Sequence, residues 1–169
     1  ATRVTFVDDL FEPVSGEWKR VSPRLATVRR ISMLVVGGVV VIVAAVLVAL
    51  LPSLRWIPAA VGVLAVAAVT WGWFWAGRNQ RSWGYAENSD DLLVTRGVMF
   101  KRLVAIPYGR MQFVDVEAGP LSRAYGIATV TLHTASPETA ADIPGLLAAD
   151  ATALRNRLTE LGESRGAGV

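Results

Sequence analysis

The residue types that most often carry out catalysis are few in this sequence. His133 is the single histidine and there is no cysteine, which excludes thiolate chemistry, disulfides and cysteine-ligated metals. A metal site needs three or four convergent ligands, and no glycine-rich loop runs into Lys-Ser or Lys-Thr as a phosphate-binding loop would. We therefore predict no enzymatic activity, catalytic residue, metal ion or cofactor. The carboxylates considered for such roles are scattered: Asp90, Asp91, Asp115, Glu117 and Asp142.

Basic side chains are the better candidates for binding. Arg110 and Arg123 either pair locally within the fold or hold an anionic group, or the carboxylate of another protein, through two parallel hydrogen bonds. No concentrated basic face coincides with stacking aromatic residues, so we do not expect a nucleic acid as partner. The residues predicted to contact lipid head groups or a protein partner are Arg24, Arg29, Arg30, Arg78, Arg81, Lys101, Arg102, Arg110 and Arg123.

Two long uncharged segments must position these residues. Residues 31–51 and residues 57–76 carry no charged side chain. About 20 helical residues span about 30 Å, the thickness of the hydrocarbon core of a bilayer. The alternative is that both segments are core helices of a soluble protein. The chain that follows the second segment is too short to cover two such helices. A cleaved signal peptide is also not expected, because its apolar region is shorter and nearer the N-terminus. The two segments therefore predict a transmembrane hairpin.

The flanking charges predict the orientation of this hairpin. Seven basic residues lie beside its outer ends and one lies in its loop. Because Lys and Arg concentrate in the cytoplasmic flanks of membrane helices, we expect a multi-pass protein of the cell membrane with both termini in the cytoplasm. The flanking residues are Lys19, Arg20, Arg24, Arg29, Arg30, Arg78 and Arg81, and the loop residue is Arg55.

The first helix is expected to begin before the membrane. Ser22 and Pro23 suit the N-cap and first positions of a helix, so we expect a helix over residues 22–51 that crosses the bilayer over 31–51. Small residues recur at intervals of four or eight on both helices, which allows close helix packing in lipid. Such packing could occur within the hairpin or against a partner subunit. The residues expected to take part in it are Gly37, Ala45, Ala49, Ala68, Gly72 and Ala76.

From Ser82 the pattern changes to short strands and ends in one amphipathic helix. Apolar residues recur at helical spacing from Leu147 to Leu161, and the polar, glycine-rich tail 162–169 is expected to be disordered. A small barrel or sandwich of about seven antiparallel strands, closed by this helix, would bury its apolar face. We expect an N-terminal cytoplasmic segment at 1–21 and a folded domain at 82–161, with strands over 81–87, 92–98, 100–106, 111–117, 127–134 and 142–143.

Several segments resemble the bacterial pleckstrin-homology-like (PH-like) domain of YdbS-like membrane proteins. The resemblance is carried by DDLLVTRG at 90–97, IPYGRMQFV at 106–114 and LSRAYGIATV at 121–130, with Trp18 and Ser22-Pro23-Arg24 ahead of the first helix. Met111 departs from the isoleucine common in that family. The resemblance implies a two-helix hairpin followed by a PH-like domain, and a complex with a larger relative that has repeated PH-like domains. It implies no particular activity.

Three functions are compatible with these observations. The favoured one is a membrane-anchored interaction or scaffold protein, a homo- or hetero-oligomeric subunit of a larger membrane complex. The second is a component that binds or handles anionic lipids. The third is a non-catalytic subunit of an enzyme or transporter.

Overall fold

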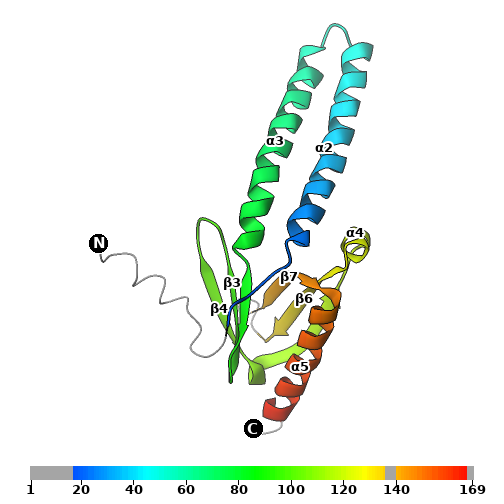
Figure 1. Ribbon diagram of the computed structural model, residues 1–169. Coiled ribbons are helices and arrows are strands. Elements are labelled where there is room, and N and C mark those ends of the chain that lie inside the picture. The colour runs from blue at the N-terminus through cyan, green and yellow to red at the C-terminus, as the bar shows by residue number, and fades with distance from the viewer. Residues whose placement is uncertain (1–16, 136–139, 167–169) are drawn as a thin grey trace, which may run out of the picture. The chain divides into compact units, whose positions relative to one another are not determined.

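The computed structural model describes residues 17–135 and 140–166 (Figure 1). The chain forms two compact units, which are described separately below. Residues Ala26–Arg78 form the first, which we call the hairpin, and the described parts of Ala1–Leu25 and Asn79–Val169 form the second, which we call the domain. Parts of the predicted segments 1–21 and 162–169 lie outside the described residues.

The hairpin consists of two long apolar helices. They are α2 (Arg24–Leu50) and α3 (Trp56–Arg81), and both are long and apolar enough to cross a membrane, with most side chains exposed. Ser22 lies just before α2, where its carbonyl accepts a hydrogen bond from the Leu25 N–H (3.1 Å) and its hydroxyl accepts one from Arg24 (3.3 Å). The helix therefore starts two residues later than predicted, with Ser22 outside it as a cap.

Glycines allow close approach between the two helices. A Cβ added to Gly37 would lie 2.3 Å from Cγ2 of Val69, and one added to Gly72 would lie 2.7 Å from the sulfur of Met33. Ala44 and Ala76 are buried. The predicted packing residues Ala45, Ala49 and Ala68 are exposed instead. At 3.6 residues per turn, a step of eight rotates a side chain by about 80° away from Gly37, whereas a step of seven brings Ala44 back within about 20°.

Substitution of the two neighbouring glycines of α2 should separate packing from helix propensity. Gly37→Ala is expected to destabilise the hairpin by about 1–3 kcal/mol through overpacking against Val69. Gly38 has no neighbour within 4 Å of an added Cβ, so Gly38→Ala should be neutral or stabilising, since alanine is the better helix former. Denaturant unfolding in mild detergent, followed by tryptophan fluorescence, measures the difference. Equal stability of the two variants would contradict the observed contact.

The domain contains two antiparallel sheets, closed by a helix. The first sheet has the order β1-β2-β3-β4, formed by Lys19–Arg20, Gly84–Glu87, Asp91–Arg96 and Arg102–Pro107; the second has the order β5-β6-β7, formed by Met111–Glu117, Ile127–Thr134 and Ala141–Leu147. Three helices complete it: η2 (Tyr108–Arg110), α4 (Pro120–Ala124) and α5 (Ala148–Gly166). The predicted PH-like arrangement of seven antiparallel strands and a C-terminal helix is confirmed.

The core lies between the sheets and one face of α5. Ala151, Leu154 and Leu158 recur at helical spacing on that face and are almost completely buried. In Figure 1, α5 lies beside β6 and β7, and it contacts both strands. The strand residues whose side chains are almost completely buried are Leu92, Val94, Ile106, Ile127, Val130, Leu132 and Ile143.

Several predicted strand ends were wrong. Helix α3 continues to Arg81, so β2 begins at Gly84 rather than at residue 81. Strand β7 covers Ala141–Leu147 rather than 142–143, although it contains Pro144 and Gly145. A strand at the edge of a sheet tolerates proline and glycine at an irregular position, and the β6–β7 register shifts between Ala128 and Val130.

Residues ahead of the hairpin form part of the domain. Strand β1 pairs with β2, and the Ser22 N–H donates to the Gly145 carbonyl of β7 (2.9 Å). Val21 and Leu25 are buried, and the buried side-chain amide of Gln80 donates to the Val21 carbonyl (2.9 Å). The domain is therefore wider than the predicted 82–161, and the hairpin is inserted between its first two strands.

Candidate functional site

A cleft of about 610 Å³ opens between the edges of the two sheets. Strands β1 and β7 are both edge strands, one in each sheet. The N-terminal part of α5 forms the third wall. We call this the β1–β7 cleft, and it is lined by Lys19, Arg20, Val21, Ser22, Pro23, Tyr85, Leu146, Leu147, Asp150, Ala153 and Arg157.

Charges in the cleft are partly balanced within the fold. Glu87 accepts from Lys19 (2.9 Å) and Arg157 (3.2 Å), and its side chain is much less exposed than theirs. Burial, followed by the charges of Glu87 and Asp150, raises the pKa of Tyr85, so this phenol stays protonated at neutral pH. The walls therefore combine apolar side chains with charges of both signs.

A second feature is the turn between β3 and β4, which we call the β3–β4 tip (residues 97–101). Met99 is 76% exposed and Phe100 is 84% exposed. Gly97 has φ +112°, and a Cβ there would lie 1.9 Å from the Phe100 carbonyl oxygen, so the turn requires glycine. Lys101 was among the predicted binding residues, but Met99 and Phe100 were not, because Phe100 was placed at the start of a strand. The signal in the sequence was the apolar run Val98-Met99-Phe100 between Gly97 and Lys101.

The predicted binding residues do not form one cluster. Within the domain, Arg81 and Lys101 line a common hollow of about 220 Å³ beside the β3–β4 tip. Arg102 is exposed at the start of β4, whereas Arg110 is exposed in η2 and Arg123 in α4.

The remaining predicted binding residues lie in α2 and α3. Arg24 donates to the Tyr125 carbonyl (3.1 Å), a contact inside the domain. Within the hairpin, Arg30 donates to the Trp73 carbonyl (3.3 Å) and lies 4.8 Å from the centre of its ring. Arg29 is half-buried and Arg78 is exposed. Contacts within the fold therefore engage at least two of these four arginines.

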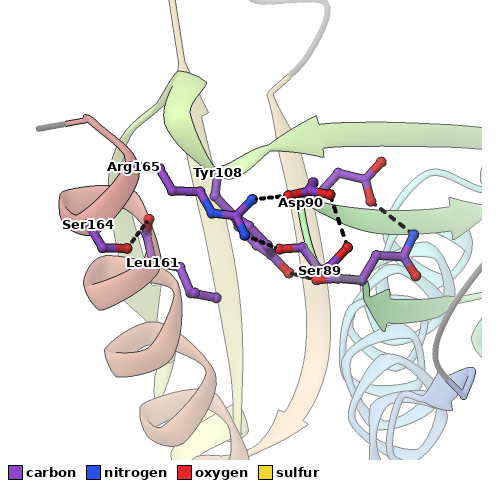
Figure 2. A network of polar contacts seen from close by, with 8 residues as sticks. Ser89, Asp90, Tyr108, Leu161, Ser164 and Arg165 are labelled. Carbon is purple, nitrogen blue, oxygen red and sulfur yellow. Dashed lines mark hydrogen bonds and ion pairs between the residues drawn. The ribbon is translucent and has the colours of Figure 1, made fainter. Parts of the chain in front are cut away.

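A polar network attaches the end of α5 to the β2–β3 turn (Figure 2). Arg165 contacts the Asp90 carboxylate and the Ser89 carbonyl, and its guanidinium lies 5.6 Å from the centre of the Tyr108 ring. Tyr108 is completely buried and donates its hydroxyl to the Asn88 carbonyl (2.9 Å); burial raises its pKa to about 12. These contacts explain why α5 continues to Gly166, although residues 162–166 were predicted to be disordered.

Acidification should weaken this attachment. A hydrogen bond from Ser89 and the Arg165 guanidinium lower the pKa of Asp90. Its stabilising contribution is therefore present above the pKa of the unfolded chain, about 3.9, and is lost as the pH falls through the lower folded-state value. We expect Asp90→Asn to lower the thermal unfolding midpoint slightly at about pH 7 and by less at about pH 3; the effect is small because exposed pairs contribute little. Asp142→Asn, at an exposed position on β7, is the control, and an Asp90→Asn effect that did not shrink on acidification would contradict the assignment.

No metal-binding geometry is present in the part of the chain that the structure describes. No three His, Cys, Asp or Glu side chains converge among those residues. His133 stacks on Phe113 of the neighbouring strand, with ring centroids 4.1 Å apart and 16° between the planes. The single histidine therefore has an aromatic partner on the sheet surface.

Two antiparallel sheets closed by a C-terminal helix, together with a transmembrane hairpin, define a membrane protein with a PH-like domain. The family model of the bacterial PH domain matches residues 22–162, and the chain belongs to this family. It is similar to the UPF0699 transmembrane protein YdbS of Bacillus subtilis (strain 168), with 33% identity over 79 residues, which cover 47% of this chain and 48% of that protein. The match thus spans about half of the curated relative. No solved structure matches the chain.

Proposed function

We propose that this protein is a membrane-anchored interaction module, a non-catalytic subunit of a larger membrane complex, which binds a protein partner in the β1–β7 cleft. The observation that carries this proposal is the position of the cleft between two edge strands, β1 and β7. An extended peptide can add a strand to such an edge, with affinity from the main chain and specificity from alternate side chains.

The lining of the cleft favours an extended protein segment as its occupant. Leu147 is 39% exposed at the end of β7 and offers an apolar contact. Asp150 on α5 and Arg20 on β1 offer charges of opposite sign on two walls. The partner segment would therefore carry an apolar side chain for Leu147 with polar or charged neighbours.

The proposed orientation places both ends of the chain in the cytoplasm. Residues before α2 and after α3 belong to one compact unit, which supports their lying on one side of the membrane. The excess of basic residues at these ends supports the cytoplasmic side. A protease applied to sealed inverted vesicles should cut the domain, whereas right-side-out cells should protect it.

A photo-crosslinking experiment on the full-length protein in its own membrane tests the partner. A crosslinking amino acid at Ala153, which lines the cleft, is expected to give a discrete product with another protein. The same group at Thr159, which is exposed on the same helix outside the cleft, should give much less. Equal products at both positions, or a strictly monomeric particle by native mass spectrometry with no crosslink, would rule the proposal out.

A further inference from the structure

We propose that the β3–β4 tip is a membrane-contact loop. Met99 and Phe100 would enter the head-group region of the bilayer that the hairpin spans, and Lys101 and Arg102 would contact anionic lipid head groups. This inference rests on the membrane anchor and not on the partner proposed for the β1–β7 cleft.

The exposure of the two apolar side chains is the first argument. Among the described residues of the domain, the large apolar side chains more than half exposed are Met99, Phe100 and Phe113. Phe113 stacks on His133, whereas Met99 and Phe100 are neighbours at the end of a turn. Contiguous exposed apolar patches mark protein or membrane interaction sites, and phenylalanine is among the residues that interfacial segments bury at the boundary between head groups and acyl chains.

The tip is held in a defined shape by its strands. Strands β3 and β4 pair up to Arg96 and Arg102, immediately before and after the turn. Gly97 closes the turn in a conformation that other residues adopt only with strain, and Arg96 lies 5.8 Å from the centre of the Trp83 ring at its base. The apolar pair is therefore presented by a paired hairpin.

The tip lies at the end of the first sheet where the chain passes from α3 into β2. Lys101 and Gly97 line the same hollow as Arg81, the last residue of that helix. Arg81 follows the end of the predicted span at Ala76 by five residues, a rise of about 7.5 Å in an α-helix. Each head-group layer is about 5–7 Å thick. Arg81, which lines the same hollow as the tip, therefore follows the end of the predicted span by about the thickness of one head-group layer along the helix axis.

The charge and shape of the tip favour a bilayer over a protein as its occupant. Lys101 and Arg102 are exposed directly after the apolar pair, and basic residues next to a membrane are attracted to anionic lipids. A protruding loop can enter a fluid interface, whereas a protein would need a matching cavity. A free anion would account for the two basic residues but leave Phe100 in water.

Depth-dependent fluorescence of the full-length protein tests this proposal. Because the chain contains no cysteine, Phe100→Cys and the control Phe113→Cys can each carry one environment-sensitive dye without further changes. In proteoliposomes of phosphatidylcholine and phosphatidylglycerol, we expect a blue-shifted dye at position 100, quenched several-fold more by spin-labelled lipid than the dye at position 113. Unchanged thermal unfolding of both labelled proteins checks the fold.

Three results would overturn the proposal. Equal lipid quenching at positions 100 and 113 would exclude insertion of the tip. A blue shift at position 100 without lipid quenching would indicate a protein occupant. Quenching that is unchanged by Lys101→Gln with Arg102→Gln, by high salt, and by omission of phosphatidylglycerol would exclude the head-group contact, since such attraction is screened by salt.

Discussion

Gly145→Ala is expected to destabilise the domain by about 2–4 kcal/mol, the sum of a positive-φ penalty of about 1 kcal/mol and an overpacking cost of about 1–3 kcal/mol. Gly145 has φ +75°, and an added Cβ would lie 2.7 Å from Cβ of Leu25 and 3.1 Å from its Cδ2. The contact with Cβ, and a further one of 3.1 Å with Cγ, lie at the stiff base of the Leu25 side chain, so the chain ahead of α2 would have to move away from β7. Urea unfolding in mild detergent, followed by circular dichroism, measures the loss.

A control and a double-mutant cycle isolate the cause. Gly109→Ala should change little, because its φ is not positive and the nearest atoms to an added Cβ are 4.0 Å away. In a Leu25→Ala background, the steric part of the Gly145→Ala cost should shrink, because residues in contact couple whereas distant ones add. Additive costs for Leu25→Ala and Gly145→Ala would show that the contact does not hold the segment against β7.

Leu154→Ala should cost about 2–5 kcal/mol of unfolding free energy, the range for leucine truncation in a well-packed core. Leu154 is completely buried at the centre of the apolar face of α5, and this helix contacts β5, β6 and β7. The side chain fills space that neighbouring strands cannot occupy without distorting their pairing. The same urea titration gives the difference in unfolding free energy.

A leucine on the same helix provides the comparison. Leu161→Ala removes the same atoms from a half-buried position, so its cost should be clearly smaller. Equal losses of stability in the two variants would contradict the packing of α5 against the sheets through Leu154.

The fold class was predictable because its signals are local. Two uncharged segments of membrane-spanning length and one helical apolar stripe identify the hairpin and α5 without any knowledge of tertiary contacts. Strand β1 gave no such signal, because two residues cannot show alternation. Strand β7 was obscured by Pro144 and Gly145, which usually end strands but are tolerated at a sheet edge.

The candidate site was less predictable, because turn geometry and strand pairing decide which residues meet. Basic residues could be identified from the sequence, yet nothing local indicates that Arg81 and Lys101 line one hollow while Arg110 and Arg123 lie elsewhere. The contact between Arg24 and the Tyr125 carbonyl joins residues far apart in the chain. A shift of one residue turns a side chain by about 100° around a helix. The prediction therefore named the exposed Ala45 instead of the buried Ala44.

The insertion of the hairpin between β1 and β2 makes the assembly of the domain depend on membrane insertion. During synthesis, β1 emerges from the ribosome first, yet its partner β2 follows only after both apolar helices. A nascent chain whose hairpin entered the membrane with its two ends on opposite sides could never pair these strands. Pairing of β1 with β2 and the hydrogen bond from Gln80 to Val21 therefore require both ends of the hairpin to lie on the same side of the membrane.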